Sequence, residues 1–204
     1  RPLYWGRLKM VVATKKHPYS RGDIDANSNI IPNSQLDEII KIFEEKSRNY
    51  KGVDFSGAPS GAKKILVTGF DPFQLHPFFS TYGAGIETQN PSGISALLLH
   101  GKTVNDSSGN TGFIQTAIFP VRYLDFDNGV VEDVITNYLN SNSINMIMSL
   151  SLYGGHYFFD LERFAGRNRG GFIDNLLVGE NNQDNIDLTN LMNETLNYAL
   201  FVDD

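Results

Sequence analysis

The stretch Lys63-Lys64-Ile65-Leu66-Val67-Thr68-Gly69-Phe70-Asp71-Pro72-Phe73 is the most specific feature of this sequence. An apolar run typical of a buried strand stops at Gly69, and a proline and two aromatic side chains follow it. A strand that ends this way delivers its next side chains to the rim of a sheet, where α/β folds keep their sites. Phe70 and Phe73 are therefore candidates for the walls of a flat apolar pocket. The alternative is that the two rings simply cover the core.

The composition is that of a globular domain with an acidic balance. The 204 residues suit one domain, or one domain with an arm, and 41% of them are hydrophobic. The net charge of −6 argues against a general binder of nucleic acid or of an anionic membrane. No apolar stretch approaches the roughly 20 residues of a membrane helix. Because cysteine is absent and the four histidines lack metal-ligand spacing, we expect no metal and no cofactor.

Residues 1–63 are predicted to form an N-terminal extension, and residues 64–204 a compact α/β domain. The extension should contain one helix, over about residues 35–48, because its apolar residues recur on one face. Residues 52–62 are rich in Gly, Ser and Pro, which indicates a linker.

From residue 64 onward, strand patterns alternate with helix patterns. We expect strands over 64–69, 113–119, 144–152 and 157–164, and helices over 91–100, 124–141 and 188–199. The run 144–152 is almost wholly apolar, which indicates a strand buried on both faces. The alternation predicts an α/β fold with a mainly parallel sheet and helices on both faces.

Three further patterns could support chemistry, and each also has a plain structural explanation. Asn90-Pro91-Ser92 opens a helix, and N-capping explains its residue types. Ser149 to Gly155 ends a strand in two glycines, whose amides would suit an oxyanion, although a turn explains them too. Glu162 is a carboxylate in an apolar stretch, so it either pairs with a nearby cation or orients a catalytic histidine.

These patterns occur in an order that resembles the pyroglutamyl peptidase I family of cysteine peptidases, over about residues 64–175. The matching blocks are Gly69 to Phe73, Asn90-Pro91-Ser92, Phe119-Pro120-Val121, Ser149 to Gly155, Glu162-Arg163-Phe164-Ala165 and Asp174-Asn175. The resemblance implies a three-layer α/β/α sandwich of the phosphorylase/hydrolase-like type. It also implies removal of N-terminal pyroglutamate from small peptide substrates and a cytoplasmic location, and it leaves open whether the protein is a homo-oligomer.

The resemblance also assigns roles to particular residues. Family members use a cysteine nucleophile, a histidine base and a glutamate that orients the histidine. Glu162 stands at the family glutamate, and Phe70 and Phe73 stand at the aromatic residues that sandwich the pyroglutamyl ring. Leu152 stands where the family has a substrate-binding glutamine. Because the chain lacks cysteine, the nucleophile and base are expected beyond Asp204, and the domain is expected to be incomplete at its C-terminus.

Two alternatives stay open. A non-catalytic relative would use the fold for binding or assembly, and Leu152 and Gly171 favour it because they replace polar family residues. An unrelated phosphate binder at Gly154-Gly155 is disfavoured, because the sequence contains neither a Gly-x-Gly-x-x-Gly nor a P-loop pattern.

Overall fold

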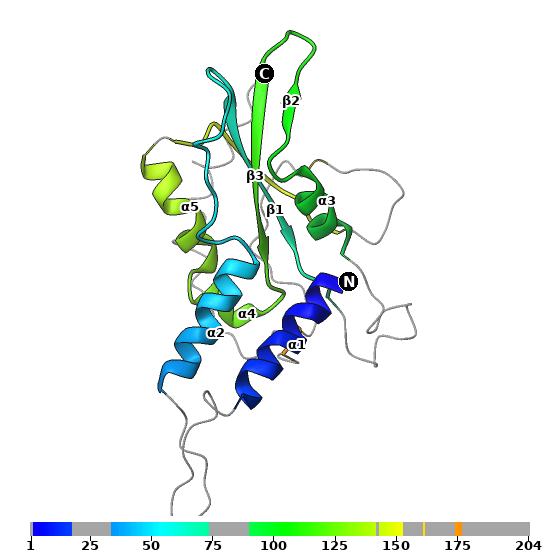
Figure 1. Ribbon diagram of the computed structural model, residues 1–204. Helices are drawn as coiled ribbons and strands as arrows, with labels where there is room; N and C mark the ends of the chain where they lie inside the picture. The colour runs from blue at the N-terminus through cyan, green and yellow to red at the C-terminus, as the bar shows by residue number, and fades with distance from the viewer. Residues whose placement is uncertain are drawn as a thin grey trace, which may run out of the picture.

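The computed structural model describes residues 2–17, 34–73, 90–141, 143–152, 161 and 174–176. The helices and strands are, in chain order, α1 (Pro2–Lys16), α2 (Ser34–Ser47), β1 (Lys63–Phe70), α3 (Pro91–Leu99), β2 (Thr103–Asn105), β3 (Thr111–Phe119), α4 (Tyr123–Asp127), α5 (Val130–Asn140) and β4 (Met146–Ser149). Figure 1 shows α1 and α2 side by side beyond the carboxyl ends of β1 and β3.

The four strands form one mixed sheet in the order β2-β3-β1-β4. β1 pairs in parallel with β3, from Lys63 opposite Gly112 to Phe70 opposite Phe119, and it pairs in parallel with β4 on its other side. β2 is antiparallel to β3. The α/β class expected from the sequence is confirmed, and the carboxyl ends of β1 and β3 lie together at one edge of the sheet.

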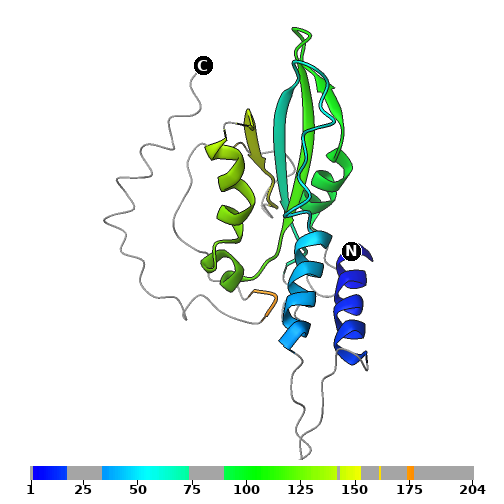
Figure 2. The same ribbon diagram turned by 60° about the vertical axis from the view of Figure 1, so that its left-hand side comes forward.

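Each face of the sheet packs against its own helix. Successive residues of β1 point to opposite faces, so Leu66 and Val67 enter different clusters. Leu66 packs with Val134 of α5, whereas Val67 packs with Ala96 of α3. All four side chains are at most 2% exposed. Figure 2 shows α5 and α3 on opposite sides of the strands. Full burial of a Val or Leu side chain stabilises the fold by about 1.5–3 kcal/mol.

The helix predicted over 124–141 is two helices, α4 and α5. The chain turns between them at Gly129, whose φ of 81° lies in the left-handed region that favours glycine. The Gly129 amide donates to the carbonyl of Phe126 at 3.0 Å, which closes the end of α4. Apolar spacing alone does not show this break, because the apolar residues of α5 follow those of α4 in nearly the same register.

The strand predicted over 144–152 exists as β4, but its predicted burial is wrong. Met146 is 46% exposed and Ile147 is 37% exposed. β4 lies at the edge of the described sheet and pairs there with β1 alone. An edge strand has a neighbouring strand on one side only, so its apolar side chains remain more exposed to solvent than those of a central strand.

Residues 1–63 contain two helices in the described part of the chain, where the sequence predicted one. The helix α1 was missed because its apolar residues do not gather on one face. Within the predicted linker, Val53 and Phe55 are buried in the core cluster of Leu66. The hydroxyl of Tyr138 donates to the Val53 carbonyl at 2.8 Å. The segment that joins α2 to β1 is therefore part of the core.

Two predicted elements, the strand over 157–164 and the helix over 188–199, lie outside the described residues. Within the described ranges, no helix combines the length and the hydropathy that crossing a bilayer requires.

Candidate functional site

The carboxyl edge of the sheet holds a buried carboxylate. Asp71 directly follows β1, and its amide donates to the carbonyl of Phe119 at 2.9 Å. Only 4% of Asp71 is exposed. Because a buried charge without a partner is costly, this carboxylate needs cationic donors.

Two N-terminal arginines supply those donors. Arg7 of α1 donates from Nη1 to Oδ1 of Asp71 at 2.8 Å. Arg48, which follows α2, donates from Nε and Nη2 to Oδ2 at 3.0 and 2.8 Å. Both arginines are at most 3% exposed. Charge-assisted bonds are stronger than neutral ones, so these contacts fix both helices against the end of β1.

The charges continue toward the surface in alternating sign. Glu44 of α2 pairs with Arg48 and also accepts from Nη2 of Arg122 at 3.3 Å. Arg122 in turn pairs with Asp125. We call this series the ion chain; its members are, in order, Arg7, Asp71, Arg48, Glu44, Arg122 and Asp125. Three guanidinium groups face three carboxylates, so the formal charges of the ion chain cancel.

Burial near the ion chain shifts the titration of its neighbours. It lowers the pKa of Arg48, and the adjacent Asp71 carboxylate opposes that shift. It raises the pKa of Tyr4 on α1, and the charge of Asp71 raises that pKa further. Burial likewise raises the pKa of Tyr50. Arginine stays protonated in proteins, and a tyrosine whose pKa is raised above its usual value near 10 stays neutral, so none of these three groups changes charge near neutral pH.

The start of α3 lies unusually close to the end of β1. Asn90 accepts from the Ser92 amide at 3.0 Å, which confirms the expected N-cap, and it donates to the Asp71 carbonyl at 3.1 Å. A Cβ placed on Gly69 would lie 2.4 Å from the Ser92 carbonyl oxygen, and one on Gly93 would lie 2.4 Å from the Phe70 oxygen. Glycine is therefore required at both positions for this approach.

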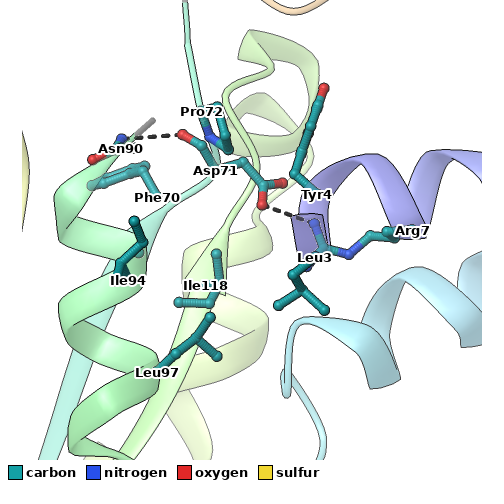
Figure 3. A pocket seen from close by; sticks show the side chains of 11 residues that line it. Leu3, Tyr4, Arg7, Phe70, Asp71, Pro72, Asn90, Ile94, Leu97 and Ile118 are labelled. Carbon is teal, nitrogen blue, oxygen red and sulfur yellow. Dashed lines mark hydrogen bonds and ion pairs between the residues drawn. The ribbon is translucent and has the colours of Figure 1, made fainter. Parts of the chain in front are cut away.

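A pocket opens between α1 and the start of α3, beside Asp71 (Figure 3). The pocket is shallow: its empty space is about 340 Å³ when open solvent is included, and only about 30 Å³ admits the centre of a water-sized sphere. Figure 3 shows Arg7 reaching from α1 toward Asp71 at one end of the pocket. Aliphatic side chains from α1, α3 and β3 form much of the remaining lining: Leu3, Ile94, Leu97 and Ile118.

One buried donor of the pocket lining has no acceptor. The two terminal nitrogens of Arg7 bond to Asp71 and to the Ser47 carbonyl, but its Nε makes no hydrogen bond. Tyr50 and Asn175 also have a buried, unpartnered atom in the described part of the chain, but neither residue lines this pocket. A buried donor left without an acceptor costs about 1–3 kcal/mol. Less than 1 Å² of this Nε is accessible, so a ligand in the pocket does not reach it unless neighbouring atoms move.

Asp174 and Asn175, which the sequence singled out as a pair, also reach this edge of the sheet. Asp174 accepts from the amide of Tyr123 at 2.8 Å. Asn175 donates from its side chain to the carbonyl of Pro72 at 2.8 Å and from its amide to the carbonyl of Val121 at 2.9 Å. The pair therefore ties the segments that follow β1 and β3 to each other.

Three of the predicted site residues, Phe70, Phe73 and Leu152, are described, and Phe70 alone among them lines this pocket. Phe70 lines the pocket and also packs on Phe119 and Phe126, with ring centroids 6.2 Å apart in both pairs. Phe73 is half-buried and is not part of the pocket lining. Leu152 lies beyond β4, is 36% exposed, and does not line the pocket either. Glu162 lies outside the described residues.

Sequence reasoning missed Arg7 and Arg48. One signal pointed to them indirectly, because Asp71 follows a buried strand and a carboxylate at such a position needs a cation. Nothing in the sequence says which of the 17 lysines and arginines supplies it. In the described ranges, no cluster of three His, Cys, Asp or Glu residues suits a metal ion.

The chain is similar to a protein of Pseudomonas aeruginosa. The family model described as "PA0049, C-terminal domain" matches residues 64–190. The protein named "Uncharacterized protein PA0049" is 28% identical over 180 residues, which are 86% of this chain and 31% of that protein. The chain thus spans about a third of the length of this relative. A match of that length cannot fit within residues 64–204, so it includes part of the segment that contains α1 and α2. No solved structure matches the chain.

These matches correct the resemblance to pyroglutamyl peptidase I. Both lead to PA0049, and nothing in them points to that peptidase family. The blocks that suggested it include a strand end, a helix cap and short polar turns, which local physical rules produce in many α/β proteins. The chain belongs to the family of the PA0049 C-terminal domain.

Proposed function

We propose that this chain is a non-catalytic recognition domain, which binds a small ligand in the pocket between α1 and α3. The observation behind the proposal is a mostly apolar pocket beside the carboxyl ends of β1 and β3, lined by Leu3, Ile94 and Leu97 among others. Pockets of this composition, with few polar groups to orient a ligand, are typical of small-molecule sites. The position of the pocket also supports ligand binding, because α/β proteins bind ligands beyond the carboxyl ends of their parallel strands.

The contacts of Asp71 favour binding over catalysis at this position. A carboxylate that acts as general base must reach a substrate proton. Three hydrogen bonds from Arg7 and Arg48 hold the Asp71 carboxylate instead. Arginine does not lose its proton in proteins, so these pairs cannot relay one. Asp71 therefore serves to position the two arginines.

Three predictions remain untested: pyroglutamyl peptidase activity, a pyroglutamyl peptide as substrate, and a homo-oligomeric state. The first two were based on the resemblance to the peptidase family, which the matches to PA0049 do not support. A fluorogenic pyroglutamyl amide tests the activity directly. For the fold, we propose that the whole domain is a three-layer sandwich, because α3 and α5 pack against opposite faces of the sheet.

A pocket-filling variant tests the recognition function. Ile94→Trp adds a large ring to the pocket lining, whereas Leu98→Trp adds the same ring on α3 at a residue that is 69% exposed and outside the lining. The wild-type protein and both variants are screened against small fragments by ligand-observed NMR. We expect fragments that bind the wild type and Leu98→Trp but not Ile94→Trp. Fragments that bind all three proteins equally would contradict the proposal.

A further inference from the structure

We infer that the α1–α2 hairpin, residues 2–16 and 34–47, packs against the same hairpin of a second copy of this chain to form a four-helix bundle. The inference does not depend on the proposed ligand and adds a partner for a different surface. Three properties of the hairpin support it: its position beyond the sheet, an exposed apolar stripe on each helix, and opposite charges on the two helices.

The hairpin projects from the rest of the domain. Figures 1 and 2 show both helices extending beyond the carboxyl ends of β1 and β3, away from the sheet. The helices run antiparallel, because α1 begins and α2 ends beside the sheet (Figure 1), where Arg7 donates to the Ser47 carbonyl at 3.3 Å. Their lengths of 15 and 14 residues are nearly equal. Two antiparallel helices of matched length form half of a four-helix bundle.

Each helix carries a stripe of exposed apolar side chains. On α1, Leu3 and Met10 are 50% and 56% exposed, and they are seven residues apart. On α2, Ile39 and Ile42 are 37% and 47% exposed, and they are three residues apart. Spacings of three and seven residues keep side chains on one face of a helix, as at the core positions of a coiled coil.

The two stripes open to the same side of the hairpin. Tyr4 and Arg7 mark the buried side of α1, and Ile40 and Phe43 mark the half-buried side of α2. At 3.6 residues per turn, each stripe lies roughly a quarter turn from that side, in the same rotational sense on both helices. In an antiparallel pair, flanks of the same sense lie on one side of the pair. The stripes therefore form one exposed apolar surface, the hairpin face, and such surfaces are typical of interaction sites.

Charge complementarity identifies a second copy as the partner. When two hairpin faces meet across a twofold axis parallel to the helices, α1 of each copy lies against α2 of the other. Lys16 is exposed on the outer flank of α1, and Glu38 is exposed on the corresponding flank of α2. Lys16 is nine residues beyond Arg7 and Glu38 is nine residues before Ser47, so the two lie at the same level. Each Lys16 therefore faces Glu38 of the second copy, as flanking charges do in helix bundles.

Matched glutamate variants test the hairpin face. Met10→Glu and Ile42→Glu place a charge on it, whereas Val12→Glu places the same charge at a 48% exposed residue on another side of α1. Far-ultraviolet circular dichroism confirms that the variants are folded, and sedimentation equilibrium measures self-association. We expect the wild type and Val12→Glu to dimerise alike at about 10–100 µM, and the other two variants to dimerise at least about tenfold more weakly.

Charge reversal tests the contact between α1 and α2 of different copies. Lys16→Glu places glutamates opposite each other, and Glu38→Lys places lysines opposite each other. We expect each variant alone to dimerise about fivefold or more weakly than the wild type. An equimolar mixture of the two should dimerise as the wild type does, because each copy then meets opposite charges. Lys15→Glu reverses the neighbouring lysine, which lies off this flank, and should leave dimerisation unchanged.

Every other result contradicts a defined step. A wild type that stays monomeric at about 100 µM would overturn the inference. Dimers that persist in both Met10→Glu and Ile42→Glu would place the interface on a different surface and overturn it too. An equal loss in Val12→Glu would remove the hairpin face as the contact. A mixture of Lys16→Glu and Glu38→Lys that associates no better than either variant alone would exclude the pairing of α1 with α2 of the second copy.

Discussion

Replacing Asp71 with asparagine should destabilise the protein strongly, because this change removes the central charge of a buried ion cluster. Asp71 accepts three charge-assisted hydrogen bonds at 2.8–3.0 Å and is 4% exposed. In Asp71→Asn, one carboxylate oxygen becomes an NH₂ donor that faces guanidinium donors, and two cations lose their shared anion. Removing one partner of a buried ion pair costs about 3–5 kcal/mol. That is a large share of the roughly 5–15 kcal/mol that stabilise a domain.

Urea unfolding measures this cost with two probes. Far-ultraviolet circular dichroism follows all helices, whereas the fluorescence of Trp5, the single tryptophan, follows α1. We expect the Trp5 transition of Asp71→Asn to come at lower urea than the circular dichroism transition, because α1 loses its ion pair with β1.

The matched control is Asp125→Asn, the same change at the half-exposed end of the ion chain. Asp125 is 27% exposed and pairs with Arg122, which is equally exposed. Pairs of this exposure contribute at most about 1 kcal/mol. A loss below about 1 kcal/mol in Asp71→Asn, or equal losses in the two variants, would refute the argument that the buried half of the ion chain fixes α1 and α2.

Three further predictions concern the close approach of α3, the core and an exposed loop. Gly69→Ala should lower the free energy of unfolding by more than about 2 kcal/mol in urea titrations, because its Cβ would meet the Ser92 carbonyl at 2.4 Å. Leu66→Ala should cost about 2–5 kcal/mol in the same assay, since Leu66 is fully buried. Asn110→Ala should raise the pKa of Asp106, because the Asn110 side chain is the main cause of its lowered pKa; carboxyl-carbon NMR measures the change. The depressed pKa of Asp106 stabilises the loop above its unfolded pKa, and this contribution is lost as the pH falls through the folded value.

Controls for these predictions come from the same elements. Gly6→Ala adds a Cβ that meets no atom within 4 Å, so it should not destabilise the protein. Leu98→Ala changes a 69% exposed side chain and should stay within about 0.5 kcal/mol of the wild type. Wild-type stability in Gly69→Ala or Leu66→Ala would contradict the packing described above. An unchanged pKa of Asp106 in Asn110→Ala would contradict the assigned cause.

The sequence was a good guide wherever local pattern decides structure. The strand around Leu66 and the helix that starts after Asn90 were both predicted, because apolar spacing and capping are local signals. It failed at α1, whose apolar residues do not share one face, and at Gly129, where one left-handed residue divides a helix.

The site was less predictable than the fold, because distant pairings create it. Arg7 and Asp71 are 64 residues apart, and no spacing rule connects them. Phe70 lines a pocket, but that pocket is formed with α1, a helix that the sequence did not reveal, and the role predicted for Phe70 stays a prediction. The short blocks that suggested a peptidase were individually explained by caps and strand ends, so their shared order was weak evidence of descent.

The most direct test of the recognition function follows the amide resonances of Gly93 and Ile94 in a ¹H–¹⁵N spectrum during titration with a fragment that binds the wild-type protein. We expect both resonances to shift to saturation, because both residues line the pocket. Saturable shifts that leave both resonances fixed would contradict binding in this pocket.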